Sequence, residues 1–526
     1  MFSSADHSVT PPRVEIPRVY NAAHDLLERN LRAGRGPKTA YIDDTGEYSY
    51  AELAARANRF ANALGKLGVQ MEQRVLLCMH DTIDFPVAFL GSIKAGVVPI
   101  AVNTLLTAAD FEYVLADSRC CAAVISASLV NTFESLFGKS RFLRHVIVSG
   151  ATEPKYRSMT QVLESASEEY EPAPTTCDDM CFWLYSSGST GAPKGTVHAH
   201  AHLIRTAELY GRSVAGYCTD DVVFSASKLP FAYGLGNSLS FPLSVGATAV
   251  LMAERPTPNA IIKRLRTHRP TVFCTIPTAY AALLAHPALP SPDEMRLRIS
   301  VSAGEALPEE VGRRWARHFG TDILDGIGST EMLHIYISNR CNDVCYGTTG
   351  FPVPGYEVKI LDDAGVPVTA GESGELYVRG PTSALLYWNN RARSCSTFLG
   401  DWMRTGDKFR QREDGRYVYE GRADDMLKVS GLYVSPAEVE AALIAHDAVL
   451  EAAVVAKEDA EGLVKPCAFV VLKSGCSVAA PELQQHVKNR LAPYKYPRWI
   501  EFVSALPKTA TGKIQRFKLR EQVARR

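Results

Sequence analysis

Hydroxyl groups, glycines and one lysine gather in a short segment that directly follows an apolar stretch. The apolar residues 180–185 lead into SSGSTGAPKG at residues 186–195. Glycines let the backbone approach a ligand closely, and successive N–H groups with serine and threonine hydroxyls can hold phosphate oxygens. The spacing differs from that of a Walker A loop. The segment predicts a phosphate-binding loop in preference to a surface turn, formed by Ser186, Ser187, Gly188, Ser189, Thr190, Gly191 and Lys194.

A second group of polar side chains follows a strand-like stretch farther along the chain. Residues 325–331 read DGIGSTE, and in α/β sheets ligands bind at the carboxyl ends of the strands. The hydroxyl of Thr330 and the carboxylate of Glu331 are oxygen groups of the kind that suits a phosphate and its Mg²⁺ ion. Taken alone, the segment also fits an ordinary turn between a strand and a helix.

Three further segments carry isolated polar groups. RTGD at 404–407 places Asp407 in a turn, where its carboxylate accepts either two ribose hydroxyls or the bonds of an Asx-turn. GRADD at 421–425, followed by KVSG at 428–431, coincides with a change in composition. PKTATGKI at 507–514 contains Lys513, and a lone lysine is usually a solvated charge.

Alternating helical and strand-like segments are expected to position these groups. SYAE at 49–52 predicts a capping box that begins an amphipathic helix ending near Leu67. Short apolar strands are predicted at 75–79, 97–102, 122–126, 222–225, 248–252, 272–276, 299–302 and 323–325. Near-continuous apolar strands separated by helices favour parallel sheets that are covered on both faces. The fold class is therefore α/β.

The pattern changes near Gly350 and again near Gly421. Residue types alternate along 356–361, 375–379 and 416–419, and turn sequences separate these segments. This pattern predicts antiparallel strands. After residue 421 the sequence predicts an α+β segment with a helix from 436 that Ser435 caps, a second helix at 481–491, and strands at 450–456 and 467–472. Its 16 basic and 12 acidic residues make this segment mildly basic. We expect an N-terminal domain at 1–420, a hinge at 421–424 and a mobile C-terminal domain at 425–526.

The composition argues against several classes of protein. The 526 residues contain 57 Lys plus Arg and 57 Asp plus Glu, a balance that does not fit a nucleic-acid binder. No apolar run reaches the ~18–20 residues that span a bilayer, and the first residues lack the apolar region of a secretory signal. The 12 cysteines include no CxxC pair and fit reduced thiols. A cytoplasmic protein with neither nucleic-acid nor membrane partners is expected.

Three histidines alternate directly after the phosphate loop, at His198, His200 and His202. On a strand, this alternation would align the three imidazoles on one face and could form a zinc site. A helix is expected to begin here instead, so the metal interpretation is the weaker one.

Together, in this order and at these distances, the five motifs resemble those of the adenylate-forming superfamily of acyl-CoA synthetases, adenylation domains and luciferases. The resemblance extends from about Asp25 to Arg520. It implies an N-terminal domain of two doubly wound α/β subdomains plus a β-barrel, and a small mobile α+β C-terminal domain. It also implies ATP and coenzyme A as co-substrates and Mg²⁺ as the metal ion.

The resemblance implies a role for each motif. The loop from Ser186 to Lys194 would hold the ATP phosphates, Thr330 would contact the α-phosphate and Glu331 would bind Mg²⁺. Lys513 would bridge the substrate carboxylate and the α-phosphate, and Asp424 would be the hinge. The residues beside adenine would be Gly304, Glu305, Ala306, Asp325, Gly326, Ile327 and Gly328. The residues that bind the ribose would be Asp407 and Arg422. The residues along the CoA tunnel would be Lys428, Ser430 and Gly431. Ile327 stands where many relatives have an aromatic residue, so apolar contact would replace stacking on adenine.

Two segments, 228–237 and 331–335, resemble benzoate-CoA ligases and their aminobenzoate and hydroxybenzoate relatives. By position, the residues around the aromatic ring would be Ala232, Tyr233, Gly234, Leu235, Gly328, Leu333 and His334. No Arg or Lys at 234–237 or 332–335 is available for a second carboxylate. His334 would either hydrogen-bond an ortho substituent or pack beside the ring and orient the carboxylate, and the second role is the preferred one.

The expected function is that of an ATP-dependent aryl-CoA ligase acting on benzoate or a ring-substituted benzoate, with 2-aminobenzoate a leading candidate. The acid would form an aryl-AMP intermediate and then the CoA thioester, releasing pyrophosphate and AMP. A stand-alone adenylation enzyme that loads an acyl carrier protein is the alternative. A non-catalytic relative would have lost Lys513, Glu331 or Asp407, and all three are present. A homodimer is the default expectation, while the ring substituent and the pathway stay open.

Overall fold

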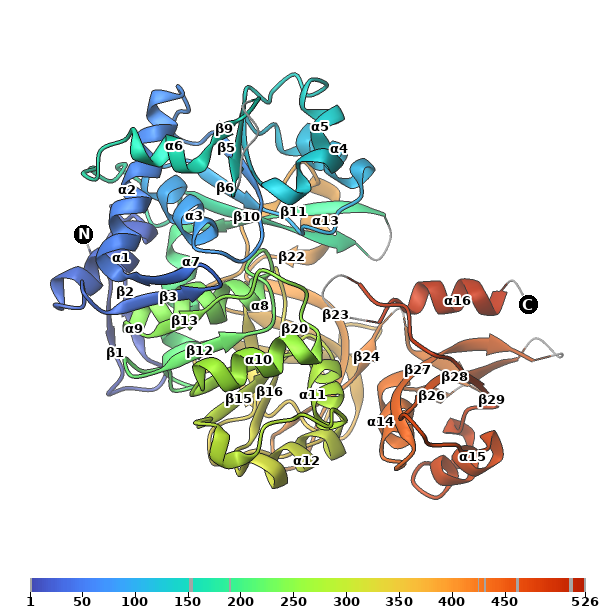
Figure 1. Ribbon diagram of the computed structural model, residues 1–526. Helices are drawn as coiled ribbons and strands as arrows, with labels where there is room; N and C mark the ends of the chain where they lie inside the picture. Colours follow the sequence, from blue (N-terminus) through green and yellow to red (C-terminus); the bar gives the residue numbers. More distant parts are fainter. Residues whose placement is uncertain are drawn as a thin grey trace.

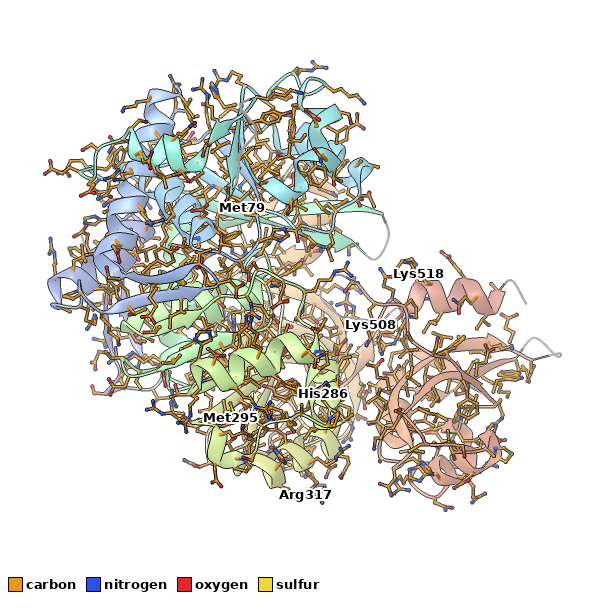
Figure 2. The ribbon with its side chains drawn as sticks, viewed as in Figure 1. Met79, His286, Met295, Arg317, Lys508 and Lys518 are labelled. Atoms are coloured by element: carbon orange, nitrogen blue, oxygen red, sulfur yellow. The ribbon has the colours of Figure 1, made fainter. Side chains whose placement is uncertain are left out.

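The computed structural model describes residues 2–150, 155–188, 191–423, 425–429, 432–459, 463–509 and 514–524. Two large sheets with their helices lie one above the other, and the C-terminal segment lies beside them (Figure 1). Side chains fill the interior of both parts, with Met79 in the upper part and Met295 in the lower one (Figure 2). Among the described helices, none combines the length and apolarity needed to cross a lipid bilayer.

The first large sheet carries the predicted phosphate loop. Its strands, in the order β21-β11-β10-β6-β5-β7-β8-β9, are β21 (Leu386–Tyr387), β11 (Gly191–Ala199), β10 (Met180–Gly188), β6 (Val98–Ala101), β5 (Arg74–Cys78), β7 (Ala122–Ser126), β8 (His145–Ser149) and β9 (Arg157–Ser158). The strands from β10 to β9 are parallel, as their apolar sequences predict. Strands β11 and β21 add an antiparallel edge.

The helices that accompany this sheet include the one whose capping box the sequence predicts. They are α1 (Ala22–Arg32), α2 (Tyr50–Lys66), α3 (Asp84–Lys94), α4 (Ala108–Ser118), α5 (Val130–Phe137) and α6 (Met159–Glu164). Ser49 and Glu52 form the predicted capping box at the start of α2, in which each side chain bonds the other residue's backbone N–H. The helix carries its apolar residues on the face toward α1 and α3.

The second large sheet carries the Asp325–Glu331 segment at the end of one of its strands. Its order is β18-β17-β16-β15-β14-β12-β13-β3-β4, with β18 (Phe351–Pro352), β17 (Ile335–Ser338), β16 (Ile323–Gly328), β15 (Ile299–Ser302), β14 (Val272–Thr275), β12 (Val222–Ser225), β13 (Thr248–Val250), β3 (Thr39–Asp43) and β4 (Gly46–Ser49). The central strands are parallel. The helices are α7 (His200–Thr206), α8 (Ala232–Leu235), α9 (Phe241–Val245), α10 (Pro258–His268), α11 (Pro277–Leu284) and α12 (Glu309–Phe319), with π-helical turns at Ala207–Arg212 and Gly236–Ser240.

An antiparallel sheet stands where the β-barrel was expected. It contains β19 (Glu357–Leu361), β20 (Ser373–Arg379), β22 (Phe398–Leu399), β23 (Trp402–Gln411) and β24 (Tyr417–Arg422), and α13 (Arg391–Thr397) precedes β22. The predicted change of pattern near Gly350 therefore coincides with a change from parallel to antiparallel pairing.

The C-terminal segment has hydrophobic clusters of its own, and its Ile444 also packs against a cluster of the second large sheet. Its elements are β25 (Leu427–Val429), β26 (Leu432–Val434), α14 (Pro436–Ile444), β27 (Val449–Glu458), β28 (Val464–Leu472), α15 (Ala480–Lys488), β29 (Trp499–Phe502) and α16 (Arg516–Ala524). Ser435 caps α14 as predicted. Strand β29 pairs in parallel with β28 and was not predicted from the sequence. The division at 420, 421–424 and 425 stays a prediction.

Helices α2 and α3 approach so closely that one position between them has no room for a side chain. A Cβ atom added to Gly91 of α3 would lie 2.6 Å from the carbonyl oxygen of Ala57 and 2.9 Å from the Cβ of Phe60, both in α2. These distances are below any normal contact, so the backbones would have to separate.

We predict that Gly91→Ala lowers the melting temperature, because overpacking a helix contact costs about 1–3 kcal/mol. Gly65→Ala in α2 is the matched control: its added Cβ meets nothing within 4 Å, and alanine is the better helix former. Thermal unfolding followed by circular dichroism measures both variants. Equal melting temperatures for the two would contradict the close packing of α2 and α3.

Candidate active site

The predicted phosphate loop is the tip of an antiparallel hairpin. β10 and β11 pair from Met180 and Ala199 up to Gly188 and Gly191. Ser189 and Thr190 lie outside the described residues. The sequence predicted the strand before the loop but not β11 after it, since the glycines and Pro193 are poor strand formers. The buried hydroxyl of Ser186 has no hydrogen-bond partner among the described residues, which fits a group that bonds a ligand.

Lys194 and Glu331, predicted from separate motifs, form an ion pair in the structure. The Lys194 Nζ atom lies 2.8 Å from Glu331 Oε1, and the two side chains are only 17% and 13% exposed. Burial would raise the pKa of Glu331, but the Lys194 ammonium and hydrogen bonds from Lys194 and Tyr387 lower it below its usual value. The carboxylate is therefore ionised and available to a cation.

Tyr387 completes this group and was not predicted from the sequence. Its hydroxyl donates to Glu331 Oε1 at 2.7 Å and accepts from Lys194 Nζ at 2.8 Å. Lys194 Nζ also lies 4.2 Å from the centre of the Tyr387 ring. Tyr387 is in a two-residue edge strand with no motif around it, so its sequence carried no signal.

The backbone of the Thr330–Glu331 turn is held from two sides. The imidazole Nε2 of His198 lies 2.8 Å from the Thr330 carbonyl oxygen, and the backbone N–H of Ala384 donates to the Glu331 carbonyl at 2.7 Å. The Thr382 hydroxyl donates to the next carbonyl, that of Met332, at 2.8 Å. These bonds fix the turn that carries both predicted reactive side chains.

The three alternating histidines do not share a face. His198 is the second-last residue of β11, while His200 and His202 belong to the start of α7, so the three imidazoles do not alternate along one strand. His198 and His202 do meet, with their Nδ1 atoms 3.0 Å apart, and His200 Nδ1 accepts the backbone N–H of Ala22. Within the described ranges, no group of three or more His, Cys, Asp or Glu side chains could hold a metal ion.

The two segments predicted beside adenine follow neighbouring strands. β15 and β16 pair up to Ser302 and Asp325, so Gly304–Ala306 and Asp325–Gly328 emerge at the same edge. Burial raises the pKa of Asp325 well above its usual value. The Glu305 carboxylate accepts the Thr278 hydroxyl at 2.6 Å. Ile327 is partly buried and contributes to the main apolar cluster.

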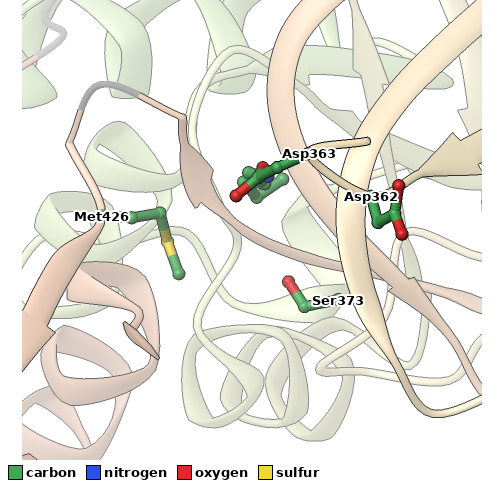
Figure 3. Close-up of a pocket in the computed structure, with 5 residues that line it drawn as sticks. Asp362, Asp363, Ser373 and Met426 are labelled. Atoms are coloured by element: carbon green, nitrogen blue, oxygen red, sulfur yellow. The ribbon is translucent and has the colours of Figure 1, made fainter. Parts of the chain in front are cut away.

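Asp407 and Arg422, predicted on the ribose, contact each other across two strands. They are register partners in β23 and β24, and Arg422 Nη1 lies 3.0 Å from Asp407 Oδ1. The next residue of β23, Lys408, points to the opposite face. There it bonds Asp363 and lines a cavity of about 100 Å³ together with Asp362, Ser373 and Met426 (Figure 3). None of the predicted site residues lines that cavity.

His334 stands among aromatic rings. Its ring centre lies 4.5 Å from that of Phe241, 5.2 Å from that of Tyr210 and 5.5 Å from that of Tyr233. Neither ring nitrogen has a hydrogen-bond partner among the described residues, and burial lowers the pKa of His334 to about 3. The imidazole is therefore neutral, and the neighbouring Tyr233 backbone opposes only part of this lowering of the pKa. Tyr210 and Phe241 were missed from the sequence, although Phe241 continues the helical spacing of Gly234 and Asn237.

Several positions around His334 are closed to larger side chains. A Cβ atom on Gly236 would lie 2.4 Å from His334 Cδ2, and one on Gly328 would lie 2.5 Å from the His334 carbonyl oxygen. Tyr233 is fixed by a 2.9 Å hydrogen bond from its hydroxyl to the Val301 carbonyl. Ala232, Leu235 and Leu333 are buried nearby in sequence, and Gly234 packs against the Lys228 backbone.

Several predicted residues cannot be located. Lys513, Asp424, Ser430 and Gly431 lie outside the described residues, and the side chains of Ser187 and Lys428 are not described. Their roles, like those of every predicted site residue, remain predictions.

Comparison with known proteins identifies the family. The AMP-binding enzyme family matches residues 27–388, and the AMP-binding enzyme C-terminal domain matches residues 438–513. The benzoate–CoA ligase of Thauera aromatica is 61% identical over 524 residues, 99% of each chain. The structure of a benzoate CoA ligase from Burkholderia xenovorans LB400 has a TM-score of 0.90 and 55% identity, and covers 95% of this chain and 100% of its own. An anthranilate CoA ligase in complex with anthranoyl-AMP has a TM-score of 0.94 and 41% identity, and covers 97% and 98% of the two chains.

The chain belongs to the AMP-binding enzyme family. The resemblance to adenylate-forming enzymes and the predicted α/β fold class are therefore confirmed.

The polar groups at the Thr330–Glu331 turn fit a magnesium ion that arrives with a nucleotide. Glu331 is ionised, and Mg²⁺ is commonly held by one or two carboxylates together with substrate phosphates. A single carboxylate supplies too few ligands for an all-protein metal site. Glu331 would hold the ion jointly with the phosphates.

We predict that the protein loses stability as the pH falls from about 6.5 towards 4. Burial lowers the pKa of His198 and His200 to about 4 and that of His334 to about 3. The unfolded chain therefore binds more protons than the folded chain in this range, and the stability present above pH 6.5 is lost on acidification.

His334→Leu removes one of these groups and keeps a similar volume. Its melting temperature should fall less steeply with acid, because each proton taken up only by the unfolded state costs about 1.4 kcal/mol per pH unit. Melting temperatures between pH 4 and pH 8, without ligands, measure the slope. Parallel curves for the two proteins would show that His334 is not buried in its neutral form.

Proposed function

We propose that this protein is an ATP-dependent aryl-CoA ligase that converts benzoate, or a ring-substituted benzoate, into its CoA thioester. The observation that carries the proposal is the continuous segment from Gly328 to His334. It bears the polar Thr330–Glu331 turn at one end and the neutral His334, enclosed by aromatic rings, at the other. Such a segment can hold a flat apolar ring close to a nucleotide phosphate. The names of the most similar relatives agree with this chemistry.

The first step joins the carboxylate to the α-phosphate and releases pyrophosphate. Two anions must approach each other, so positive charge is needed where they meet. We propose that the 186–194 loop holds the phosphates, that Thr330 contacts the α-phosphate and that Lys513 bridges the two reactants. When bound with ATP at Glu331, magnesium supplies charge neutralisation. Asp407 and Arg422 are proposed to bind the ribose, and Gly304–Ala306 with Asp325–Gly328 to flank the adenine.

In the second step the thiol attacks the carbonyl carbon of the aryl-adenylate, so that the aroyl group forms a thioester bond to sulfur and AMP leaves with the oxygen of the broken C–O bond. The small domain, joined at the 421–424 hinge, would present the Lys428–Gly431 loop and open a route for the pantetheine arm. Coenzyme A is the proposed thiol. Transfer to an acyl carrier protein is the alternative outcome of the experiment below. We propose that the reaction takes place in the cytoplasm.

The residues predicted around the aromatic ring favour an unsubstituted ring or one with a small polar substituent. The residues predicted around the ring carry no charge, so a second carboxylate would be buried without a partner. The unbonded nitrogens of His334 could accept an amino group or bond a hydroxyl at the ortho position. Benzoate and 2-aminobenzoate are therefore the first acids to test.

The decisive experiment measures AMP release with ATP, Mg²⁺ and coenzyme A for benzoate and its 2-amino, 2-hydroxy, 3-hydroxy and 4-hydroxy derivatives. A CoA-dependent signal with one preferred ring supports the proposal. Exchange of pyrophosphate into ATP without CoA-dependent turnover would assign the thiol to a carrier protein. No exchange with any of these acids would refute activation of a benzoate.

We predict that Lys513→Ala slows adenylate formation about 100-fold or more, because it removes the positive charge between two anions. Thioester formation from a supplied aryl-adenylate should be spared. Lys518→Ala is the control, an exposed lysine on α16 that follows five residues later in the sequence (Figure 2). Pyrophosphate exchange reports the first step and thioester absorbance the second. Equal loss in both steps would refute the assigned role.

We predict that His334→Ala changes the ratios of kcat/KM between ring-substituted benzoates by about tenfold and so alters their ranking. The substitution opens space and removes the polar nitrogens beside the ring. His286→Ala, outside the predicted site segments, is the control. Steady-state rates for the five acids give the ranking. An unchanged order would place His334 outside the specificity determinants.

A further inference from the structure

The segment Thr382–Trp388 joins the phosphate-loop hairpin to the Thr330–Glu331 turn. On one side the backbone N–H of Trp388 donates to Gly195 at 2.8 Å, and that of Leu385 donates to Val197 at 2.9 Å. On the other side Thr382 and Ala384 bond the turn itself. The hairpin and the turn belong to different sheets, and this segment crosses between them.

Tyr387 is the residue of this segment whose side chain enters the group of reactive side chains. Its hydroxyl bonds Glu331 at 2.7 Å and Lys194 at 2.8 Å, and the residue is 2% exposed. Both Lys194 and Tyr387 reach the same carboxylate oxygen, Oε1. The ring of Tyr387 also packs on Phe398, with a distance of 5.2 Å between the ring centres. This contact supports the ring position in addition to the hydrogen bonds with Lys194 and Glu331.

Lys194 and Glu331 would contact different groups once a nucleotide binds. Lys194 is proposed to move to the phosphates and Glu331 to face the metal ion, so their mutual ion pair must loosen. A buried carboxylate that loses its partner pays a large cost unless another donor remains. A neutral hydroxyl can remain, because it donates to the carboxylate without competing with the ion for its charge.

We propose that Tyr387 is a positioning residue that keeps the Glu331 carboxylate in place when ATP and its metal ion draw Lys194 away. The proposal rests on the nucleotide site of the proposed function and adds a residue to it. It assigns to Tyr387 an effect on metal-dependent ATP affinity, separate from any effect on the aryl pocket.

The test is the binding of ATP to Tyr387→Phe, measured by calorimetry without any aryl acid, in Mg²⁺ and in EDTA. Tyr387→Phe keeps the ring and removes the hydroxyl. The matched control is Tyr156→Phe, since Tyr156 also donates to a glutamate, Glu134 at 2.8 Å, that is paired with Lys155. Circular dichroism and the melting temperature verify that each variant is folded.

We expect Tyr387→Phe to raise the Kd of ATP in Mg²⁺ about tenfold, to change it less than twofold in EDTA, and to leave benzoate affinity unchanged. In a Glu331→Gln background the same substitution should have no further effect, which isolates the Tyr387–Glu331 contact. Tyr156→Phe should bind ATP like the unsubstituted chain.

Three results would overturn the proposal. Unchanged binding in Mg²⁺ would leave Tyr387 a packing residue, and equal loss in Mg²⁺ and in EDTA would assign its effect to the phosphate loop through Lys194. Additive effects of Tyr387→Phe and Glu331→Gln would show that the two side chains act separately. If the unsubstituted chain itself bound no ATP, the proposed function would fail, and this inference with it.

Discussion

The pairing of the Glu331 carboxylate with the Lys194 ammonium is the interaction on which the site depends. Each charge would be costly at this burial without the other. The two residues come from motifs far apart in the chain and from different sheets. The antiparallel edge formed by β11 and β21 brings Lys194 and Tyr387 to the turn after β16, so the architecture of both sheets converges on one buried polar contact. The rest of the site is arranged around that contact.

Close approach of backbone and ring shapes the apolar half of the site in the same way. Gly236 permits the ring of His334 to lie where a methyl group would collide with it, and Phe241 and Tyr210 close the other sides. The neutral imidazole of His334, which has no hydrogen-bond partners among the described residues, is therefore buried from solvent. Such an arrangement is unstable in isolation and is tolerated where a ligand completes it.

Much of this could be predicted from the sequence, and the failures have physical reasons. Apolar strands with caps and turns predicted the parallel sheets, the capping box at Ser49 and the cap at Ser435, because these depend on local chemistry. Strand β11 was missed because its glycines and proline favour a loop, and pairing with β10 overrides that preference. Tyr387, Tyr210 and Phe241 were missed because their importance arises only from contacts between distant segments. The roles assigned to Lys513, Asp424 and Gly431 still rest on the motifs alone.

The balance of charge links the reaction to the position of the small domain. Lys194 and Glu331 neutralise each other, and the residues predicted around the aryl ring are uncharged, with His334 held neutral by burial. The large domain therefore offers no unused positive charge from these groups to an incoming carboxylate. A cation for the carboxylate must come from another segment, and Lys513 is the candidate that the motifs provide. Because that lysine lies beyond the predicted hinge at 421–424, adenylation would require one placement of the predicted small domain. Withdrawal of the Lys513 ammonium with the small domain would then favour the departure of AMP in the thioester-forming step.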